Sequence, residues 1–201
     1  MARGVTVSSR QTTSLLGRHY MDCHRSALVL VAELSEEQFR WRPPKGPQSI
    51  AWNLWHIARW DDVLAEVLVA RTASLSHLGP AHQIWKSSNI TEDWRLGGVQ
   101  LGVEDAGTGL TDADAATINL PEKHAVVAYV GEAFRHLDTV LTGIEDALLP
   151  QIVPPPVLYP SQLQPDTYGD DIMIWLQHAN AHLGMMEALK GMLGLRGSLS
   201  D

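Results

Sequence analysis

The stretch His178-Ala-Asn-Ala-His182-Leu-Gly-Met-Met-Glu-Ala-Leu-Lys-Gly-Met-Leu193 is the most informative part of the chain. Apolar residues and both histidines recur here in alternating steps of three and four, the spacing of one face of a helix packed in a bundle. The predicted face consists of Trp175, His178, His182, Met185, Leu189 and Met192. The stretch therefore predicts a bundle helix whose two histidines are shielded from water.

Two histidines four residues apart stand on the same face of a helix, with Cβ atoms about 5–6 Å apart. Imidazoles at that spacing can bind one metal ion. A chain with nine histidines produces such a pair readily by chance, and two core histidines bonded to backbone carbonyls or water would give the same pattern. The metal-site interpretation therefore requires a third ligand from another part of the chain.

His56 is the candidate for that third ligand. It lies in a second predicted helix, which begins after the N-cap residue Ser49 and continues to about Leu68. Its large apolar neighbours in the sequence are Trp52, Trp55, Ile57 and Trp60. A histidine in these surroundings is expected to be buried, and each of its ring nitrogens then needs a partner. A metal ion on one nitrogen and a carbonyl or carboxylate on the other would meet both needs.

Two further helices are predicted over about residues 13–34 and 121–148, because apolar residues recur there in steps of three and four. Cys23 lies on the apolar face of the first of these helices, so we expect a buried and unreactive thiol. His19 and His24 flank that face and are expected to be partly exposed. The helix over residues 121–148 carries no histidine on its apolar face and is expected to supply packing only.

Two long connections separate these helices. Residues 72–120 are rich in glycine, and an irregular segment of that length in a compact domain indicates a functional or interface insertion. Within it, Trp85 and Trp94 are expected to pack back over a cleft, whereas His77 and His82 are expected to be solvated. The second connection is rich in proline and is expected to be extended chain over about residues 149–169.

Four amphipathic helices without convincing strands predict an all-α fold, a four-helix bundle with two long connections. We expect one domain over residues 1–201, with the insertion at about 72–120. The long connections permit a topology other than simple up-down-up-down, but they do not choose one.

The composition limits the kinds of partner. Hydrophobic residues make up 45% of the chain and charged residues 19%, so a sizeable core can form. The net charge of −8, without a basic stripe, argues against nucleic acid. The N-terminus lacks the apolar run of a signal peptide, and no stretch approaches the ~18 apolar residues of a membrane span. With a single cysteine there is no intrachain disulfide, so we expect a cytoplasmic protein without a membrane partner.

Three stretches of the chain together resemble a known superfamily: Trp41-Arg-Pro-Pro44, Ser49-Ile-Ala-Trp-Asn-Leu-Trp-His-Ile-Ala-Arg-Trp-Asp-Asp62 and residues 178–194. They are similar to the DinB-like (YfiT-like) metal-binding proteins, and the resemblance extends over about residues 13–194. It implies a four-helix bundle, often a homodimer, with a divalent metal ion, zinc or nickel, held by three histidines. The matching positions are His56, His178 and His182.

The same resemblance implies a function. Relatives include S-transferases that use bacillithiol or mycothiol, a mycothiol-dependent maleylpyruvate isomerase, and N-terminal domains of ergothioneine-pathway sulfoxide synthases. The expected protein is a metal-dependent enzyme that uses a low-molecular-weight thiol against a small electrophile. Two alternatives stay open: a non-catalytic metal-binding or structural dimer, and a bundle with polar core histidines and no metal.

No general base can be assigned from the sequence. Ala179 follows His178, so the glutamate of the HExxH zinc peptidases is absent. Asp62 lies nearly two helical turns beyond His56. Asn53 lies one turn before His56 and Asn180 lies between the paired histidines, but surface or packing roles explain both equally well. The catalytic and substrate-binding residues are therefore unassigned.

Overall fold

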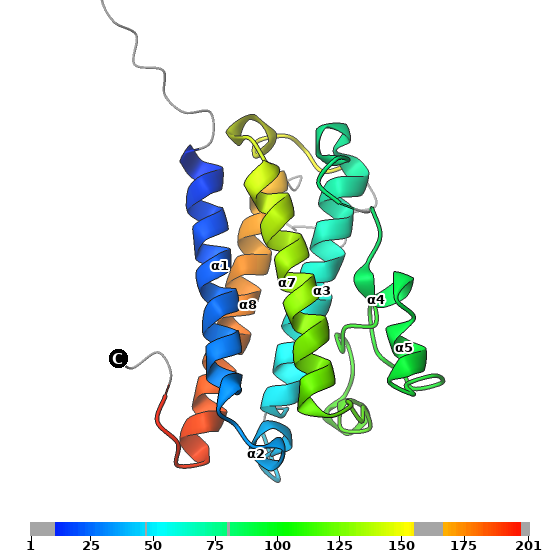
Figure 1. Ribbon diagram of the computed structural model, residues 1–201, viewed down its shortest axis with the longest axis vertical. Coiled ribbons are helices and arrows are strands. Elements are labelled where there is room, and N and C mark those ends of the chain that lie inside the picture. Colours follow the sequence, from blue (N-terminus) through cyan, green and yellow to red (C-terminus); the bar gives the residue numbers. More distant parts are fainter. Residues whose placement is uncertain (1–10, 47, 80, 155–166, 198–201) are drawn as a thin grey trace, which may run out of the picture.

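Four long helices build the fold of the computed structural model, which describes residues 11–46, 48–79, 81–154 and 167–197 (Figure 1). They are α1 (Gln11–Ala32), α3 (Ile50–Arg71), α7 (Lys123–Gly143) and α8 (Tyr168–Met192). Apart from two isolated β-bridges, the described ranges contain no extended pairing. The predicted all-α four-helix bundle is therefore confirmed. None of the helices in the described ranges has the combination of length and apolar character that crossing a bilayer requires.

The packing of the four helices fixes the topology that the sequence left open. Helix α3 packs against both α7 and α8, and α1 packs against the same two helices. In the view of Figure 1, α1 and α8 run downward along the chain, whereas α3 and α7 run upward. Consecutive long helices α3 and α7 are therefore parallel neighbours. A 22-residue helix is about 33 Å long, so the chain between them has to return along the bundle.

Residues 72–122 make this return, and we refer to them as the crossover. The crossover contains four short helical segments, η1 (Ala73–Leu75), α4 (Ile84–Ser87), α5 (Ile90–Asp93) and α6 (Asp112–Ala115). Trp85 is buried at 1% exposure and packs with Trp55 on α3 and Tyr129 on α7. The crossover is thus anchored to both parallel helices. Its histidines His77 and His82 are exposed, as predicted.

Side-chain caps set the ends of the helices. Ser49 caps α3 by accepting from the backbone N–H of Trp52, as the sequence predicts. Thr167 forms a capping box with Asp170 at the start of α8, so that helix begins two residues earlier than predicted. The short helix α2 (Glu36–Arg40) has a capping box at Ser35. In the first turn of α1, the backbone N–H groups of Thr12 and Thr13 donate to the carboxylate of Asp146 in η2 (Asp146–Leu148). Part of the proline-rich connection, residues 155–166, lies outside the described residues.

The buried face of α8 differs from the predicted one. Its buried residues are Tyr168, Ile172, Trp175, Leu176, Ala179, Leu183, Met186 and Leu189. His178 and His182 are half-buried at the edge of this face, and Met192 is 60% exposed. The prediction was wrong in part because α8 carries apolar residues on most sides, so that more than one line of three-and-four steps fits its sequence.

The thiol of Cys23 is buried on α1, and burial raises its pKa from 9.0 to about 12. It is therefore protonated at neutral pH, as expected for an unreactive core cysteine.

His24 on α1 is buried at 3% exposure, so the prediction of a partly exposed side chain was wrong. Its Nε2 lies 3.0 Å from a carboxylate oxygen of Asp61 on α3, and its Nδ1 lies 2.9 Å from one of Asp138 on α7. The ring also stacks on Phe134 at 3.9 Å. These partners come from other helices, so the α1 sequence does not reveal them. The His24 side chain ties three helices together.

The two carboxylates favour the doubly protonated imidazole. Burial by itself lowers the pKa of His24, but the hydrogen bonds and charges of Asp138 and Asp61 outweigh it and raise the pKa from 6.5 to about 9. Because the folded-state pKa exceeds the unfolded one, the stabilisation is complete below about pH 6.5 and is lost as the pH rises through about 9.

We therefore predict that the free energy of unfolding falls between pH 6.5 and 9.5, by at most about 3 kcal/mol. Urea unfolding of the wild type and His24→Gln at several pH values measures this. His24→Gln is expected to be less stable than the wild type at pH 6.5, and its free energy of unfolding should fall little as the pH rises. His19→Gln removes an exposed histidine from the same helix and should keep the wild-type decline. A wild-type free energy of unfolding that stays constant between pH 6.5 and 9.5 would contradict the prediction.

Candidate metal centre

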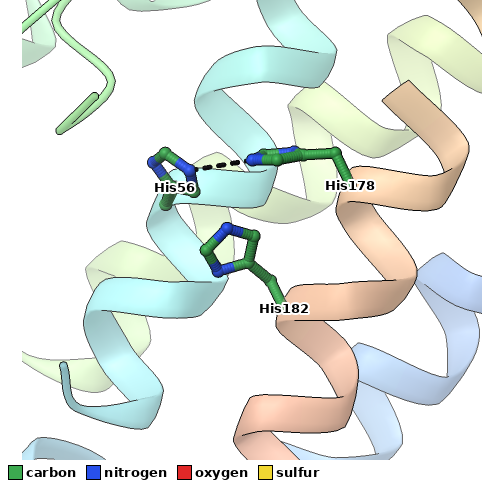
Figure 2. A group of neighbouring side chains, drawn as sticks. All are labelled: His56, His178 and His182. Carbon is green, nitrogen blue, oxygen red and sulfur yellow. Dashed lines mark hydrogen bonds between the residues drawn. The ribbon is translucent and has the colours of Figure 1, made fainter. Parts of the chain in front are cut away.

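Three histidines from two helices meet on one side of the bundle interior. His56 comes from α3, and His178 and His182 come from the neighbouring helix α8. Figure 2 shows the three rings turned toward one another. One ring nitrogen from each histidine lies within 4.8 Å of the others, and the two Nε2 atoms of His56 and His178 are 3.0 Å apart. The structure thus brings together all three residues that the sequence singled out.

The spacing of the rings suits a single metal ion. The ring centroids are 4.9 Å apart for His56 and His178, 4.4 Å for His56 and His182, and 4.6 Å for His178 and His182. Ligand nitrogens about 2.0–2.1 Å from a tetrahedral zinc ion lie about 3.3 Å from each other. Two imidazole nitrogens at 3.0 Å share either a proton or a cation, so the triangle fits a three-histidine metal site.

The backbone of the crossover fixes the orientation of the His56 ring. His56 Nδ1 donates a hydrogen bond to the carbonyl oxygen of Ala106. Because a carbonyl can only accept, the proton must be on Nδ1, and the lone pair of Nε2 faces the other two histidines. A ring held in this way is oriented as a metal ligand.

Asn53 does the same for His182. Its Oδ1 lies 2.7 Å from His182 Nδ1, while its Nδ2 donates to the carbonyls of Gln48 and Ser49 at 3.0 and 2.9 Å. These two donations fix the orientation of the amide, so Oδ1 is the acceptor and His182 Nε2 is left for a metal. Asn53 is 1% exposed. The sequence interpretation missed this role of Asn53. Its position one turn before His56 was the feature of the sequence that pointed to it.

All three imidazoles are neutral at neutral pH. Burial, followed by the neighbouring charges of His182 and His178, holds the pKa of His56 well below its usual value. Burial lowers the pKa of both His178 and His182 from 6.5 to about 4. Neutral imidazole is the form that binds metal ions, so the histidines require no deprotonation in order to act as ligands.

A buried arginine holds the crossover segment that carries the Ala106 carbonyl. Arg59 has no exposure, and its guanidinium donates to the carbonyls of Glu104 at 2.6 Å and Asp105 at 3.1 Å. Its charge is balanced by Asp62 at 3.1 Å, which also accepts from the backbone N–H groups of residues 84 and 85. Asp62 therefore belongs to this anchor and does not face the histidines.

Residues 101–108 form a small closed turn beside the site. The N–H of Val103 donates to the Thr108 carbonyl at 2.9 Å, and that of Gly107 donates to the Leu101 carbonyl at 2.6 Å. Gly107 has φ +85°, and a Cβ there would lie 2.5 Å from the Trp52 ring. Only glycine fits this position, so the turn can approach α3 closely enough to reach His56.

A cavity of about 360 Å³ opens beside the three histidines. His56 and His178 form part of its wall, and the other lining residues are Trp52, Trp60, Gly107, Thr108, Ile174 and Trp175. Trp60 and Trp175 stack at 4.4 Å, and Trp60 Nε1 donates to Thr108 Oγ1 at 3.0 Å. A ligand in this cavity would meet two of the histidines and a largely aromatic surface.

We predict that His182→Ala lowers the affinity for Zn²⁺ sharply, because two ligands remain in place of three. His77→Ala, which removes an exposed crossover histidine, should retain the wild-type affinity. Elemental analysis of protein purified without a histidine tag, followed by competition with a chelator, measures both. Equal metal content in the two variants would refute the assignment.

We further predict that Asn53→Ala weakens the affinity for Zn²⁺ by about 10–100-fold, because His182 loses the partner that orients its ring. Asn180→Ala is the matched control, since Asn180 is exposed on α8 and its amide donates to the Leu176 carbonyl, one turn earlier on the same helix. The same chelator competition applies. Comparable affinities in these two variants would show that Asn53 does not position the ligand.

Comparison with solved structures supports the fold. The chain is similar to a conserved protein from Enterococcus faecalis whose crystal structure is known, with a TM-score of 0.71 and 20% sequence identity. The match covers 91% of this chain and 98% of that one. At this level of identity the likeness concerns the fold alone.

No curated protein sequence matches the chain. A family model described as the DinB superfamily matches residues 20–186, a range that includes all three histidines. Because this match extends over most of the sequence and agrees with the helical bundle, the chain belongs to the DinB superfamily.

Proposed function

We propose that the protein is a metal-dependent enzyme of the thiol S-transferase type. In this proposal His56, His178 and His182 would hold one divalent ion, zinc or nickel. The thiolate sulfur of a low-molecular-weight thiol would form a bond to a carbon of a small electrophile and displace its leaving group. The observation that carries the proposal is the convergence of three neutral imidazoles beside an aromatic-walled cavity. Three protein ligands leave a further coordination position, as in catalytic sites.

The chemistry of the donor set favours thiol activation. A divalent cation held by three neutral histidines would keep a coordinating thiol as the thiolate, which is the reactive form. The residues of this chain then have to orient the ligands and keep water away. Ala106 and Asn53 supply the orientation through the hydrogen bonds to His56 and His182.

The cavity supports a small, largely apolar second substrate. The rings of Trp52, Trp60 and Trp175 form much of its wall, and its volume of about 360 Å³ suits a molecule of modest size. Aromatic walls of this kind bind apolar or planar groups and exclude water. An electrophile held there would lie beside the histidines.

The absence of an acidic residue from the cavity favours S-transfer over hydrolysis. No aspartate or glutamate is among the described residues that line it. Hydrolysis in the zinc peptidases uses a glutamate as general base, and Ala179 occupies that position here. Thiol chemistry would not call for a carboxylate at this position, because a bound divalent cation would favour the thiolate and the thiol proton would pass to solvent water.

The alternative, a non-catalytic metal-binding or structural dimer, would gain support from a metal ion with no open coordination position or from a large apolar interface that buries Trp85 or Trp94. Trp85 is buried within a single chain, against Trp55 and Tyr129. It is therefore not available to a partner. The homodimer that the family resemblance implies stays an expectation, which sedimentation of the purified protein would test.

We predict that the Zn²⁺- or Ni²⁺-loaded protein conjugates a low-molecular-weight thiol to a fluorogenic electrophile such as monochlorobimane. Bacillithiol, mycothiol, cysteine and glutathione are the thiols to compare. His182→Ala should fall to the uncatalysed rate, whereas His77→Ala should retain the wild-type rate. A fully loaded wild-type protein that is inactive with every thiol would count against the proposal.

A further inference from the structure

A second cavity, of about 320 Å³, lies at the start of α3, between that helix and the end of the crossover. Its polar lining consists of Arg40, Arg42, Gln48, Ser49 and Asn119. Arg42 belongs to the Trp41-Arg-Pro-Pro44 stretch, which the metal centre does not use. None of the described residues that line this cavity is acidic, although the whole chain carries a net charge of −8.

Hydrogen-bond donors outnumber acceptors around this cavity. Arg40 is already occupied, since it pairs with Glu36 and donates to the Leu120 carbonyl at 2.8 Å. Arg42 is half-buried and makes no hydrogen bond or ion pair within the described ranges. The side-chain nitrogen of Gln48 is also buried and has no acceptor among the described residues. Buried donors without acceptors cost free energy, so a ligand rich in acceptors suits this cavity.

The chemical class of that ligand follows from the arginines. A guanidinium presents a planar fork of N–H donors that matches the two oxygens of a carboxylate or phosphate. With two guanidinium groups and one carboxylate partner, that of Glu36, an excess of positive charge remains. An oxyanion would supply both the missing acceptors and the missing charge.

Trp52 connects this cavity with the metal centre. Trp52 is a lining residue of both cavities. Its ring stacks on the His56 ring at a centroid distance of 4.6 Å and an interplanar angle of 15°. Its buried Nε1 has no acceptor within the described ranges. Trp52 is therefore a lining residue of the cavity beside Arg42 and a direct neighbour of the metal-facing His56.

We propose that the cavity beside Arg42 binds the oxyanion group, a carboxylate or phosphate, of a substrate whose other end reaches the metal centre. Binding of the oxyanion is independent of the proposed function. Its assignment to a substrate of the metal centre, by contrast, rests on that function, and the two parts are tested separately.

The first test titrates the ¹⁵N-labelled full chain with inorganic phosphate and, separately, with succinate, at constant ionic strength. The expected result is a saturable shift of the Trp52 indole and Arg42 Nε–H signals. Arg42→Gln should raise the dissociation constant of the anion by about 10–100-fold, because the binding free energy of a hydrogen bond to a charged group is lost. Comparison of the two anions distinguishes a phosphate site from a carboxylate site.

Arg18→Gln is the matched control, because it removes the same charge from an exposed position on α1 and should bind as the wild type does. Arg42→Lys keeps the charge without the fork, and its affinity should fall between those of the wild type and Arg42→Gln. Equal affinities of the wild type and Arg42→Gln, or no saturable shift with either anion, would overturn the oxyanion site.

The second test uses the Co²⁺-loaded protein and the thiolate-to-cobalt absorption band. Glutathione should bind at least tenfold more tightly than its diethyl ester, and Arg42→Gln should abolish that difference. Equal binding of acid and ester by the wild type would overturn the link between the two cavities. If neither thiol produces the band, the proposed thiol chemistry fails, whereas the anion titration still decides the oxyanion site.

Discussion

Helices α3 and α7 lie side by side and run in the same direction, and this parallel pairing governs the rest of the structure. Since α7 starts at the opposite end of the bundle from the end of α3, the intervening chain has to travel back along their length. The return path passes the second turn of α3, where His56 lies. The long irregular segment is thus both a topological necessity and the source of the backbone carbonyl that orients a candidate metal ligand.

Arg59 connects this path with the helices. Burying an ion pair is costly unless further hydrogen bonds compensate for the lost hydration. Arg59 and Asp62 meet this requirement, because the arginine also bonds to Gln83, Tyr129 and two crossover carbonyls. Three parts of the molecule converge on one cation: α3, α7 and the crossover. The position of the Ala106 carbonyl therefore depends on the packing of the bundle itself.

The four long helices and the three clustered histidines could be predicted from the sequence, because helical spacing and a family resemblance both depend on the identity of the side chains. The sequence predicted a carbonyl or carboxylate partner for His56, but it did not identify which residues are the partners of those histidines. The acceptor for His56 is a main-chain carbonyl, which leaves no mark in the choice of side chain at position 106. Asn53 was visible but ambiguous, and His24 appeared exposed because its carboxylate partners belong to two other helices. In each of these cases the sequence did not reveal a contact between segments that are far apart in the chain.

The closed turn at residues 101–108 limits the insertions and deletions that this part of the chain can accept. Its four internal backbone hydrogen bonds connect fixed positions. Gly102 leaves no room for a side chain against the Thr108 carbonyl, which lies 2.5 Å from the position of a Cβ. Adding or deleting one residue here would shift the register of the turn and point a different carbonyl at His56. Relatives that share this arrangement should vary in length elsewhere in the crossover and keep the number of residues in this turn constant.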